Sequence, residues 1–265
     1  MKKVLFINQE IAPYVPDSEM AIPGRELPKA IYDLGNEIRT FMPKWGIVNE
    51  RRNQLHEVIR LSGMNLIIND TDHPLIIKVA SIPSSRVQVY FIDNSDFFSR
   101  RSMATDEKGT AYADNGERAI FYARGVLETV KKLRWTPDII LCQGWISAVI
   151  PFYLKKAYNE EPCFADCKVI TCLYRNDIKG KLNEHFQEFV EFEEAKKEML
   201  EGYKKVFDYN ELLKMSIDYS DGIIESGEGV SQELLEYAES KNIPLLRYSG
   251  EDGLGNAYND FYSSL

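Results

Sequence analysis

Short apolar runs alternate with segments of helical periodicity along most of the chain. Three of these runs, Lys3–Asn8, Asp138–Cys142 and Lys168–Cys172, are almost wholly apolar, as in strands that are covered on both faces. Strands that alternate with helices pair in parallel through right-handed crossovers. The sequence therefore predicts an α/β fold with a doubly wound, mostly parallel sheet in a single Rossmann-like domain over residues 1–265.

The remaining elements follow from the same patterns. Further strands are expected at Ile38–Met42, Gly222–Glu225 and Ile243–Tyr248, and the runs Leu66–Ile68, Leu75–Ala80 and Val87–Ile92 indicate an antiparallel β excursion. Helices are expected at Leu27–Leu34, Ala148–Tyr158, Leu212–Asp221, Val230–Ser240 and the last residues, with a long acidic helical region over Glu184–Lys205. The pattern Asp114-x-x-Glu117 has the form of a capping box before another helix.

Charge and composition exclude several classes of function. A net charge of −9 disfavours nucleic acid and anionic membranes as partners, because both require clustered Lys and Arg. The apolar start of the chain stops at Asn8, too early for a signal peptide, so we expect a cytoplasmic protein. The four cysteines lack zinc-type spacing, the histidines are scattered, and neither a metal site nor a cofactor is expected.

Five ordered motifs resemble those of one enzyme family. They are Asn8-Gln9-Glu10-Ile11-Ala12-Pro13-Tyr14 with Leu27-Pro28-Lys29-Ala30, Met42-Pro43-Lys44-Trp45-Gly46, Tyr112-x-Asp114-Asn115-x-x-Arg118, Pro137-Asp138-Ile139-Ile140 with Trp145, and Leu212-Leu213-Lys214 with Tyr219-Ser220-Asp221. The series resembles the N-terminal, acceptor-side half of bacterial glycogen and starch synthases, retaining glucosyltransferases of GT-B fold. The resemblance covers about residues 1–230 and implies the N-terminal half of a GT-B fold, with 231–265 as a closing helix-strand-helix.

The first cleft loop departs from the family pattern. An ungapped alignment places Pro16 on the family's phosphate-facing lysine, and Ser18 and Glu19 on its two glycines. Glycines let backbone N–H groups approach a diphosphate, whereas proline offers no donor and a carboxylate repels the anion. We expect that this loop does not hold a nucleotide diphosphate; the alternative is an ordinary proline-rich surface loop.

Two further loops lack the family's histidines. Gln143-Gly144-Trp145 stands in place of His-Asp-Trp, and the segment Thr171–Tyr174 stands in place of Thr-Ile-His-Asn. Gln143 is able to hydrogen-bond a sugar hydroxyl but cannot carry a proton near neutral pH. Arg175 either binds an anion or is a solvated surface charge.

The resemblance implies a candidate substrate cleft and no assigned catalytic residue. Its residues are Tyr14, Ser18, Glu19, Asp114, Asn115, Gln143, Trp145, Tyr174 and Arg175. Two of them have structural alternatives, because Trp145 is able to fill the core beneath a helix and Asp114 to serve only as a helix cap.

Three hypotheses about function remain open. In the first, the chain is a glycogen/starch-synthase-like domain that is inactive alone and binds an α-glucan or oligosaccharide. About 35 residues follow the matched segment, too few for a second nucleotide-binding domain. In the second, a partner chain carrying the nucleotide-sugar domain completes a split glycosyltransferase. In the third, the chain is a non-catalytic interaction protein that contacts its partner through Phe186, Phe189 and Leu200.

Overall fold

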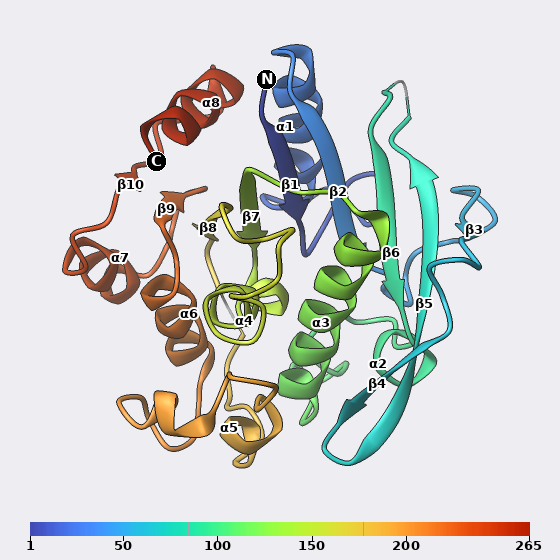
Figure 1. Ribbon diagram of the computed structural model, residues 1–265, viewed down its shortest axis with the longest axis vertical. Coiled ribbons are helices and arrows are strands. Elements are labelled where there is room, and N and C mark those ends of the chain that lie inside the picture. Colours follow the sequence, from blue (N-terminus) through green and yellow to red (C-terminus); the bar gives the residue numbers. More distant parts are fainter. Residues whose placement is uncertain (84, 177) are drawn as a thin grey trace.

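The sheet has the predicted α/β organisation (Figure 1). The computed structural model describes residues 1–83, 85–176 and 178–265. The strands are β1 (Lys3–Ile7), β2 (Glu37–Pro43), β3 (His56–Glu57), β4 (Met64–Ile68), β5 (Thr71–Ser81), β6 (Gln88–Asp93), β7 (Ile139–Gln143), β8 (Lys168–Leu173), β9 (Gly222–Glu225) and β10 (Leu245–Leu246). Their order in the sheet is β10-β9-β8-β7-β1-β2-β6-β5-β3, and β4 pairs with β5.

Parallel pairing runs without interruption from β10 to β6. Ile7 on β1 lies beside Phe41 on β2 and Cys142 on β7, so these strands end at a common edge of the sheet. The antiparallel excursion is also confirmed, because β5 pairs antiparallel with both β4 and β6. In doubly wound folds, ligands bind beyond the carboxyl ends of the parallel strands.

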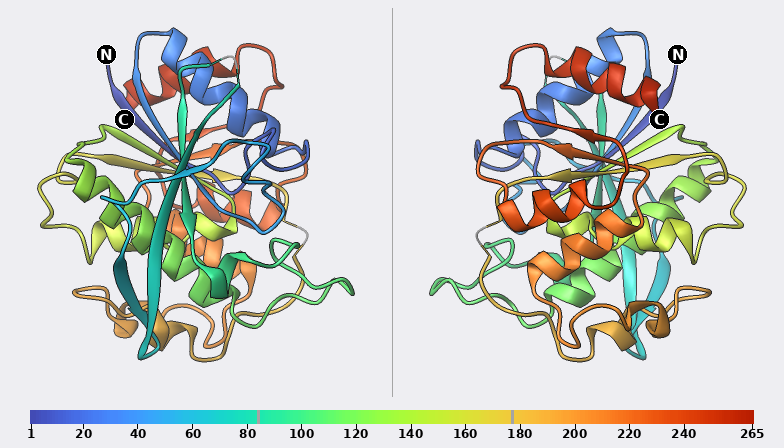
Figure 2. Two further views of the ribbon diagram at one scale, coloured as in Figure 1. Left: turned by 90° about the vertical axis from the view of Figure 1, so that its right-hand side faces the viewer. Right: turned by 90° about the vertical axis from the view of Figure 1, so that its left-hand side faces the viewer.

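Two helical layers cover the sheet (Figure 2). One layer contains α3 (Asn115–Leu133), α4 (Ile150–Lys155), α6 (Tyr209–Asp218) and α7 (Gln232–Glu239), and the other contains α1 (Ala21–Asp33) and α8 (Leu254–Ser264). Along β1, Leu5 and Ile7 pack in the core of the first layer, whereas Val4 and Phe6 pack beneath α1 and α8. Burial of both faces explains why the strand sequences are continuously apolar.

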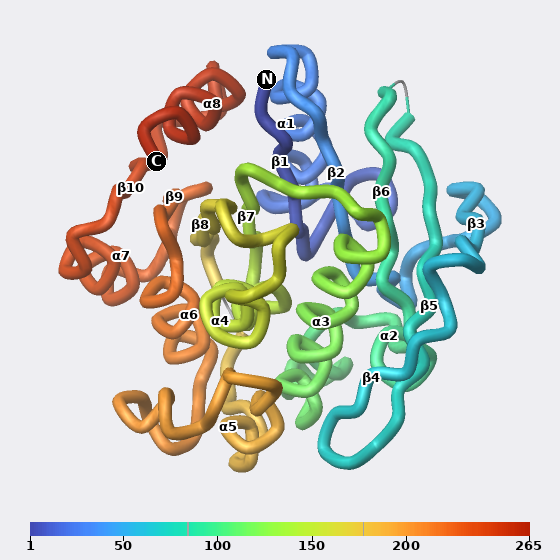
Figure 3. The backbone as a smooth tube through the Cα atoms, in the orientation of Figure 1, coloured from blue at the N-terminus to red at the C-terminus, as the bar shows by residue number. Residues whose placement is uncertain are grey.

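Helix α8 completes the smaller layer. The backbone passes from α7 through β10 to α8, which lies against α1 (Figure 3). Tyr258 and Tyr262 are each 1% exposed and pack with Phe6 of β1. The Tyr258 hydroxyl lies 2.9 Å from Ser226 Oγ in the loop after β9. This helix therefore buries one face of the sheet and also contacts a loop at the strand ends.

Helix α1 begins at Ala21 rather than at the predicted Leu27. Pro23 lies in the first turn, where a missing N–H costs no intrahelical bond. Pro28 lies inside the helix and removes the bond to the carbonyl of Gly24. Burial of the helix face that carries Leu27 and Ile31 outweighs that loss. The earlier start of the helix could not be predicted from the prolines in this segment.

The predicted long helix over Glu184–Lys205 is wrong. This segment forms the short α5 (Phe186–Phe189), a bridge between Phe192 and Ala195, and the 3₁₀ turn η2 (Lys197–Leu200). Carboxylates at Glu191 and Glu194 would repel each other on one helix face, and tertiary burial decides the path instead. Phe186 and Leu200 are 1% and 0% exposed, so they pack within this chain rather than facing a partner.

The other differences concern element boundaries and two short elements. The predicted helix Ala148–Tyr158 is shortened to α4 and follows the 3₁₀ turn η1 (Trp145–Ser147). The predicted strand Ile243–Tyr248 is reduced to β10, and neither β3 nor α2 (Ser95–Phe98) was predicted.

All four cysteines are free, and burial raises the pKa of Cys172 to about 12. Within the described ranges, no helix combines the length and apolarity needed to cross a membrane.

We expect Tyr258→Phe to lower the free energy of unfolding by about 1 kcal/mol, because it removes the hydrogen bond to Ser226. Tyr262→Phe is the matched control on the same helix. Among the described residues, the buried Tyr262 hydroxyl has no partner, so removing it should not destabilise the protein. Urea unfolding with unchanged m-values measures both effects; equal losses in the two variants would contradict the assigned contact.

Candidate functional site

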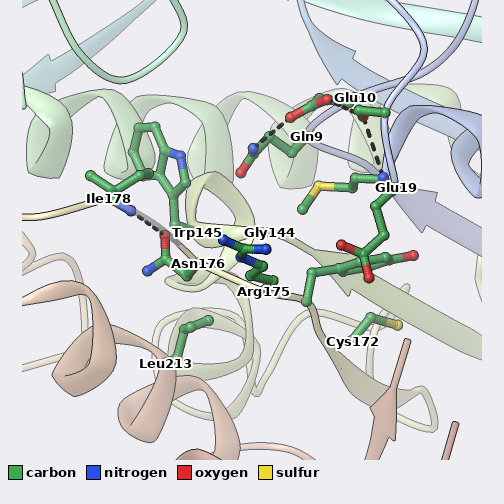
Figure 4. Close-up of a pocket in the computed structure, with 13 residues that line it drawn as sticks. Gln9, Glu10, Glu19, Gly144, Trp145, Cys172, Arg175, Asn176, Ile178 and Leu213 are labelled. Carbon is green, nitrogen blue, oxygen red and sulfur yellow. Dashed lines mark hydrogen bonds between the residues drawn. The ribbon is translucent and has the colours of Figure 1, made fainter. Parts of the chain in front are cut away.

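A cavity of about 200 Å³ opens at the carboxyl ends of β1, β7 and β8 (Figure 4). Its lining comes from the loops after these strands, the start of α1 and one residue of α6. The lining residues are Gln9, Glu10, Ser18, Glu19, Met20, Gly144, Trp145, Cys172, Tyr174, Arg175, Asn176, Ile178 and Leu213. An adjoining groove shares Ser18, Glu19 and Arg175 and extends along Glu228, Gly229 and Tyr248. The cavity has room for a small ligand, and the groove for a longer one.

One wall is a hydrogen-bonded chain of polar side chains. Gln9 Nε2 donates to Glu10 Oε1 at 3.0 Å, and Ser18 Oγ donates to Glu10 Oε2 at 2.6 Å. Ser18 Oγ also accepts from the backbone N–H groups of Met20 and Ala21, at 3.3 and 2.9 Å. Ser18 thus satisfies donors at the start of α1 and joins them to the carboxylate of Glu10.

Glu19 reaches from the same wall to the loop after β9. A Cβ at position 227 would collide with its Oε1 atom, so the glycine at that position is what lets the carboxylate approach the backbone. On the neighbouring wall, the Arg175 side chain lies along Gly229. The cavity therefore contains two carboxylates, from Glu10 and Glu19, and one guanidinium.

Three buried polar atoms of lining residues have no hydrogen-bond partner among the described residues. They are Trp145 Nε1, a donor, Gln9 Oε1, an acceptor, and the hydroxyl of Tyr174, which is able to do both. The three side chains are 3%, 7% and 4% exposed. An unpaired buried donor or acceptor costs about 1–3 kcal/mol, so a bound group that both donates and accepts would stabilise this wall.

Two amides at the ends of neighbouring strands also lack partners. Asn8 follows β1 and Gln143 ends β7, and both are fully buried. Within the described part of the chain, neither side-chain amide has a hydrogen-bond partner. Neither residue lines the cavity.

Five of the residues predicted from the sequence lie together on the cavity wall, and these are Ser18, Glu19, Trp145, Tyr174 and Arg175. Trp145 also belongs to the core and makes an edge contact with Tyr209 at 5.8 Å between ring centroids. Its ring therefore serves as packing while its N–H borders the cavity. Burial raises the pKa of Tyr174 well above its ordinary value, so this side chain is a neutral phenol.

Three other predicted residues lie outside the cavity. Tyr14 is buried against Phe91, with ring centroids 4.9 Å apart, and burial raises its pKa. Asp114 is the N-cap residue of α3, but its side chain makes no capping hydrogen bond among the described residues, which corrects the capping-box prediction. Its carboxylate forms a bidentate pair with Arg100, both contacts at 2.6 Å, because the guanidinium offers two donors to it.

Asn115 is occupied by structural hydrogen bonds. Its Nδ2 donates to the Ala104 carbonyl and to Tyr209 Oη, and its Oδ1 accepts from Arg118. Arg118 is itself fully buried and donates to the carbonyls of Phe97 and Met103. Desolvation lowers the pKa of Arg118 to about 10. These two residues fasten the loop between β6 and α3.

The sequence analysis did not single out several lining residues. Gln9 and Glu10 directly follow β1, so their place after a buried strand was an available signal. Leu213 comes from α6, far along the chain, and Ile178 follows a loop. No sequence pattern places those two at the cavity, because tertiary packing brings them there.

The chain belongs to the starch synthase catalytic domain family, whose model matches residues 3–248. It is 38% identical over 181 residues to the glycogen synthase of Chlorobium limicola, covering 68% of this chain and 37% of that protein. The glycogen synthase of Chlorobaculum parvum is 30% identical over 240 residues, covering 90% of this chain and 48% of the relative. The chain thus spans about half or less of the length of these relatives.

A solved structure shows the same fold. The catalytic domain of Starch Synthase IV from Arabidopsis thaliana, bound to ADP and acarbose, superposes with a TM-score of 0.73 at 16% identity. The match covers 92% of this chain and 51% of that one. This similarity confirms the predicted N-terminal half of a GT-B fold.

Gly144→Ala should lower the free energy of unfolding by about 1–3 kcal/mol. Gly144 has φ +80° and ψ 170°, and an added Cβ would lie 2.8 Å from Gln9 Cβ. Gly253→Ala is the control, because Gly253 has a similar φ of +74° with nothing within 4 Å. Chemical denaturation compares the two, and a larger loss at Gly253 would refute the packing of Gln9 on Gly144.

Proposed function

We propose that this glycogen/starch-synthase-like domain binds the end of an uncharged α-glucan or oligosaccharide and does not transfer glucose on its own. The observation that carries the proposal is the unpartnered pair of Trp145 Nε1 and Gln9 Oε1 in one cavity. A sugar hydroxyl both donates and accepts, so hydroxyl groups are suitable partners for both atoms. The names of the relatives support this ligand class.

The adjoining groove has room for further sugar residues of a polymer. It continues from the cavity past Glu228 and Tyr248 and has a volume of about 810 Å³. Carboxylates and a phenol along such a groove are hydrogen-bond partners for sugar hydroxyls. A terminal sugar residue would occupy the cavity, and the following residues would lie in the groove.

The lack of independent transfer follows from the chemistry of the cavity wall and of Gln143 at the end of β7. Gln143 is an amide and cannot act as a general acid or base near neutral pH. Stabilising a departing diphosphate requires cations or backbone donors aimed at the developing charge, and here Glu10 and Glu19 border the cavity.

A second candidate is half of a split glycosyltransferase, completed by a partner chain that carries a nucleotide-sugar domain. The names of the glycogen synthase relatives, which describe a transferase activity, support it. In this case the partner would supply the donors for the diphosphate, and positioning at the shared cleft would accelerate transfer. Co-purification of a second Rossmann-like chain is its test.

We expect Trp145→Phe to weaken binding of maltohexaose about 5- to 10-fold, since one hydrogen bond to the ligand is lost. Trp135→Phe is the matched control, because Trp135 is also buried but its indole N–H donates to Glu37 at 2.6 Å, away from the cavity. Titration calorimetry at equal protein stability measures both. Equal affinity of the Trp145→Phe variant and the parent chain would show that the indole N–H does not bind the ligand, and it would refute the proposal.

The chain alone should not elongate maltohexaose when supplied with ADP-glucose or UDP-glucose. The reason is that two carboxylates and one guanidinium line the cavity, whereas a leaving diphosphate needs an excess of positive charge. Release of nucleoside diphosphate and the product chain length are the measurements. Elongation at an ordinary enzymatic rate, on the order of 1 per second, would refute the claim of inactivity.

A further inference from the structure

We infer that the groove between α1 and α8 is a docking site for a basic amphipathic helix of a partner protein. The two helices lie side by side on the same face of the sheet (Figure 2), and the groove between them has a volume of about 520 Å³. It shares none of the described residues that line the cavity at the strand ends. Its role therefore does not depend on the proposed function.

The shape of the groove comes from the way in which the two helices touch. Gly255, in the first turn of α8, packs directly against α1, because a Cβ at this position would lie 2.8 Å from the Cβ of Ala30. Both residues also line the groove, so the groove lies beside this point of contact. A groove between two helices that approach closely at small residues accommodates the ridge of a third helix.

The walls of the groove are largely aliphatic. Ile22, Glu26, Ala30 and Leu34 follow one another at intervals of four residues, so they form one stripe along α1. Ile22 and Leu34 are 37% and 47% exposed, and Leu254 adds a half-buried side chain from α8. Aliphatic side chains that are exposed together at a groove are typical of a protein interaction site.

The charge of the groove selects the occupant. Glu26, Asp33 and Glu251 border it, and its described lining residues include no Lys or Arg. Glu26 also pairs with Arg25 at 2.7 Å, in a partly exposed contact that contributes little. Lys and Arg side chains beside the apolar stripe of a bound helix would meet complementary carboxylates. A second copy of this chain is disfavoured, because its groove carries the same charges and its net charge is −9.

The position of the groove links it to the cleft. Ile22, Pro23 and Glu251 also line the groove that extends from the cavity. A helix that inserts apolar residues at i, i+3 or i+4, and i+7 between α1 and α8 would therefore lie beside the mouth of the cleft. The docked partner would border the site without occupying it.

The test uses two synthetic helical peptides of about 14 residues as probes. Both carry leucine along one face; one has lysine and the other glutamate at the remaining positions. We expect the leucine–lysine peptide to bind the chain, and I22S/L34S to weaken this binding at least about tenfold, because two apolar contacts are lost. I47S/I67S is the matched control, because Ile47 and Ile67 are 42% and 59% exposed outside the groove. Fluorescence anisotropy of labelled peptide measures the affinities.

A second pair of variants tests the charge of the groove. We expect D33N/E251Q to weaken binding of the leucine–lysine peptide about fivefold at low salt. The remaining affinity should depend less on salt, because fewer charge pairs are left to be screened. E160Q/E194Q is the control for the net charge of the chain, since it removes two exposed carboxylates that lie outside the groove.

Four results would overturn the inference. The first is the absence of binding between the leucine–lysine peptide and the parent chain, and the second is equal binding of the leucine–glutamate peptide. The third is a loss of affinity in either control variant equal to that in its groove counterpart, because the attraction would then be general to the surface. The fourth is self-association of the parent chain that I22S/L34S abolishes, which would assign the groove to a second copy.

Discussion

The structure depends on burying both faces of a parallel sheet. Hydrogen bonding in parallel register requires crossovers, and each crossover helix must cover apolar strand residues on one side. Helices α3, α4, α6 and α7 cover one face, and α1 and α8 cover the other. The same register brings the ends of β1, β7 and β8 to one edge. The parallel register that allows both faces to be buried therefore also forms the cavity at the strand ends.

Within that frame, the cleft combines features of two kinds. Buried atoms of Trp145 and Gln9 have no partner among the described residues, and the proposed function assigns them to hydroxyl groups of a sugar. Glu10, Glu19 and Arg175 supply the charges of the same cavity. A fold shared with the starch synthase catalytic domain family thus carries both neutral and charged groups at the ends of its parallel strands.

The strands were predictable because double burial leaves a continuous apolar run, as in Lys168–Leu173. The segment after Glu184 was not predictable, since its helical composition is overridden by burial of Phe186 and Leu200. In the site, the alignment with the family's first cleft loop identified Ser18 and Glu19. The same criterion did not show that Asn115 is consumed by internal hydrogen bonds, because such bonds depend on segments distant in sequence.

The buried guanidinium of Arg118 has a consequence for the loop between β6 and α3. The guanidinium donates to the carbonyls of Phe97 and Met103 in the interior, where dissolved ions do not reach. Screening weakens exposed pairs such as Arg25–Glu26 but acts little on buried groups. Concentrated salt therefore weakens the partly exposed Arg100–Asp114 pair of this loop, while its interior anchor at Arg118 persists.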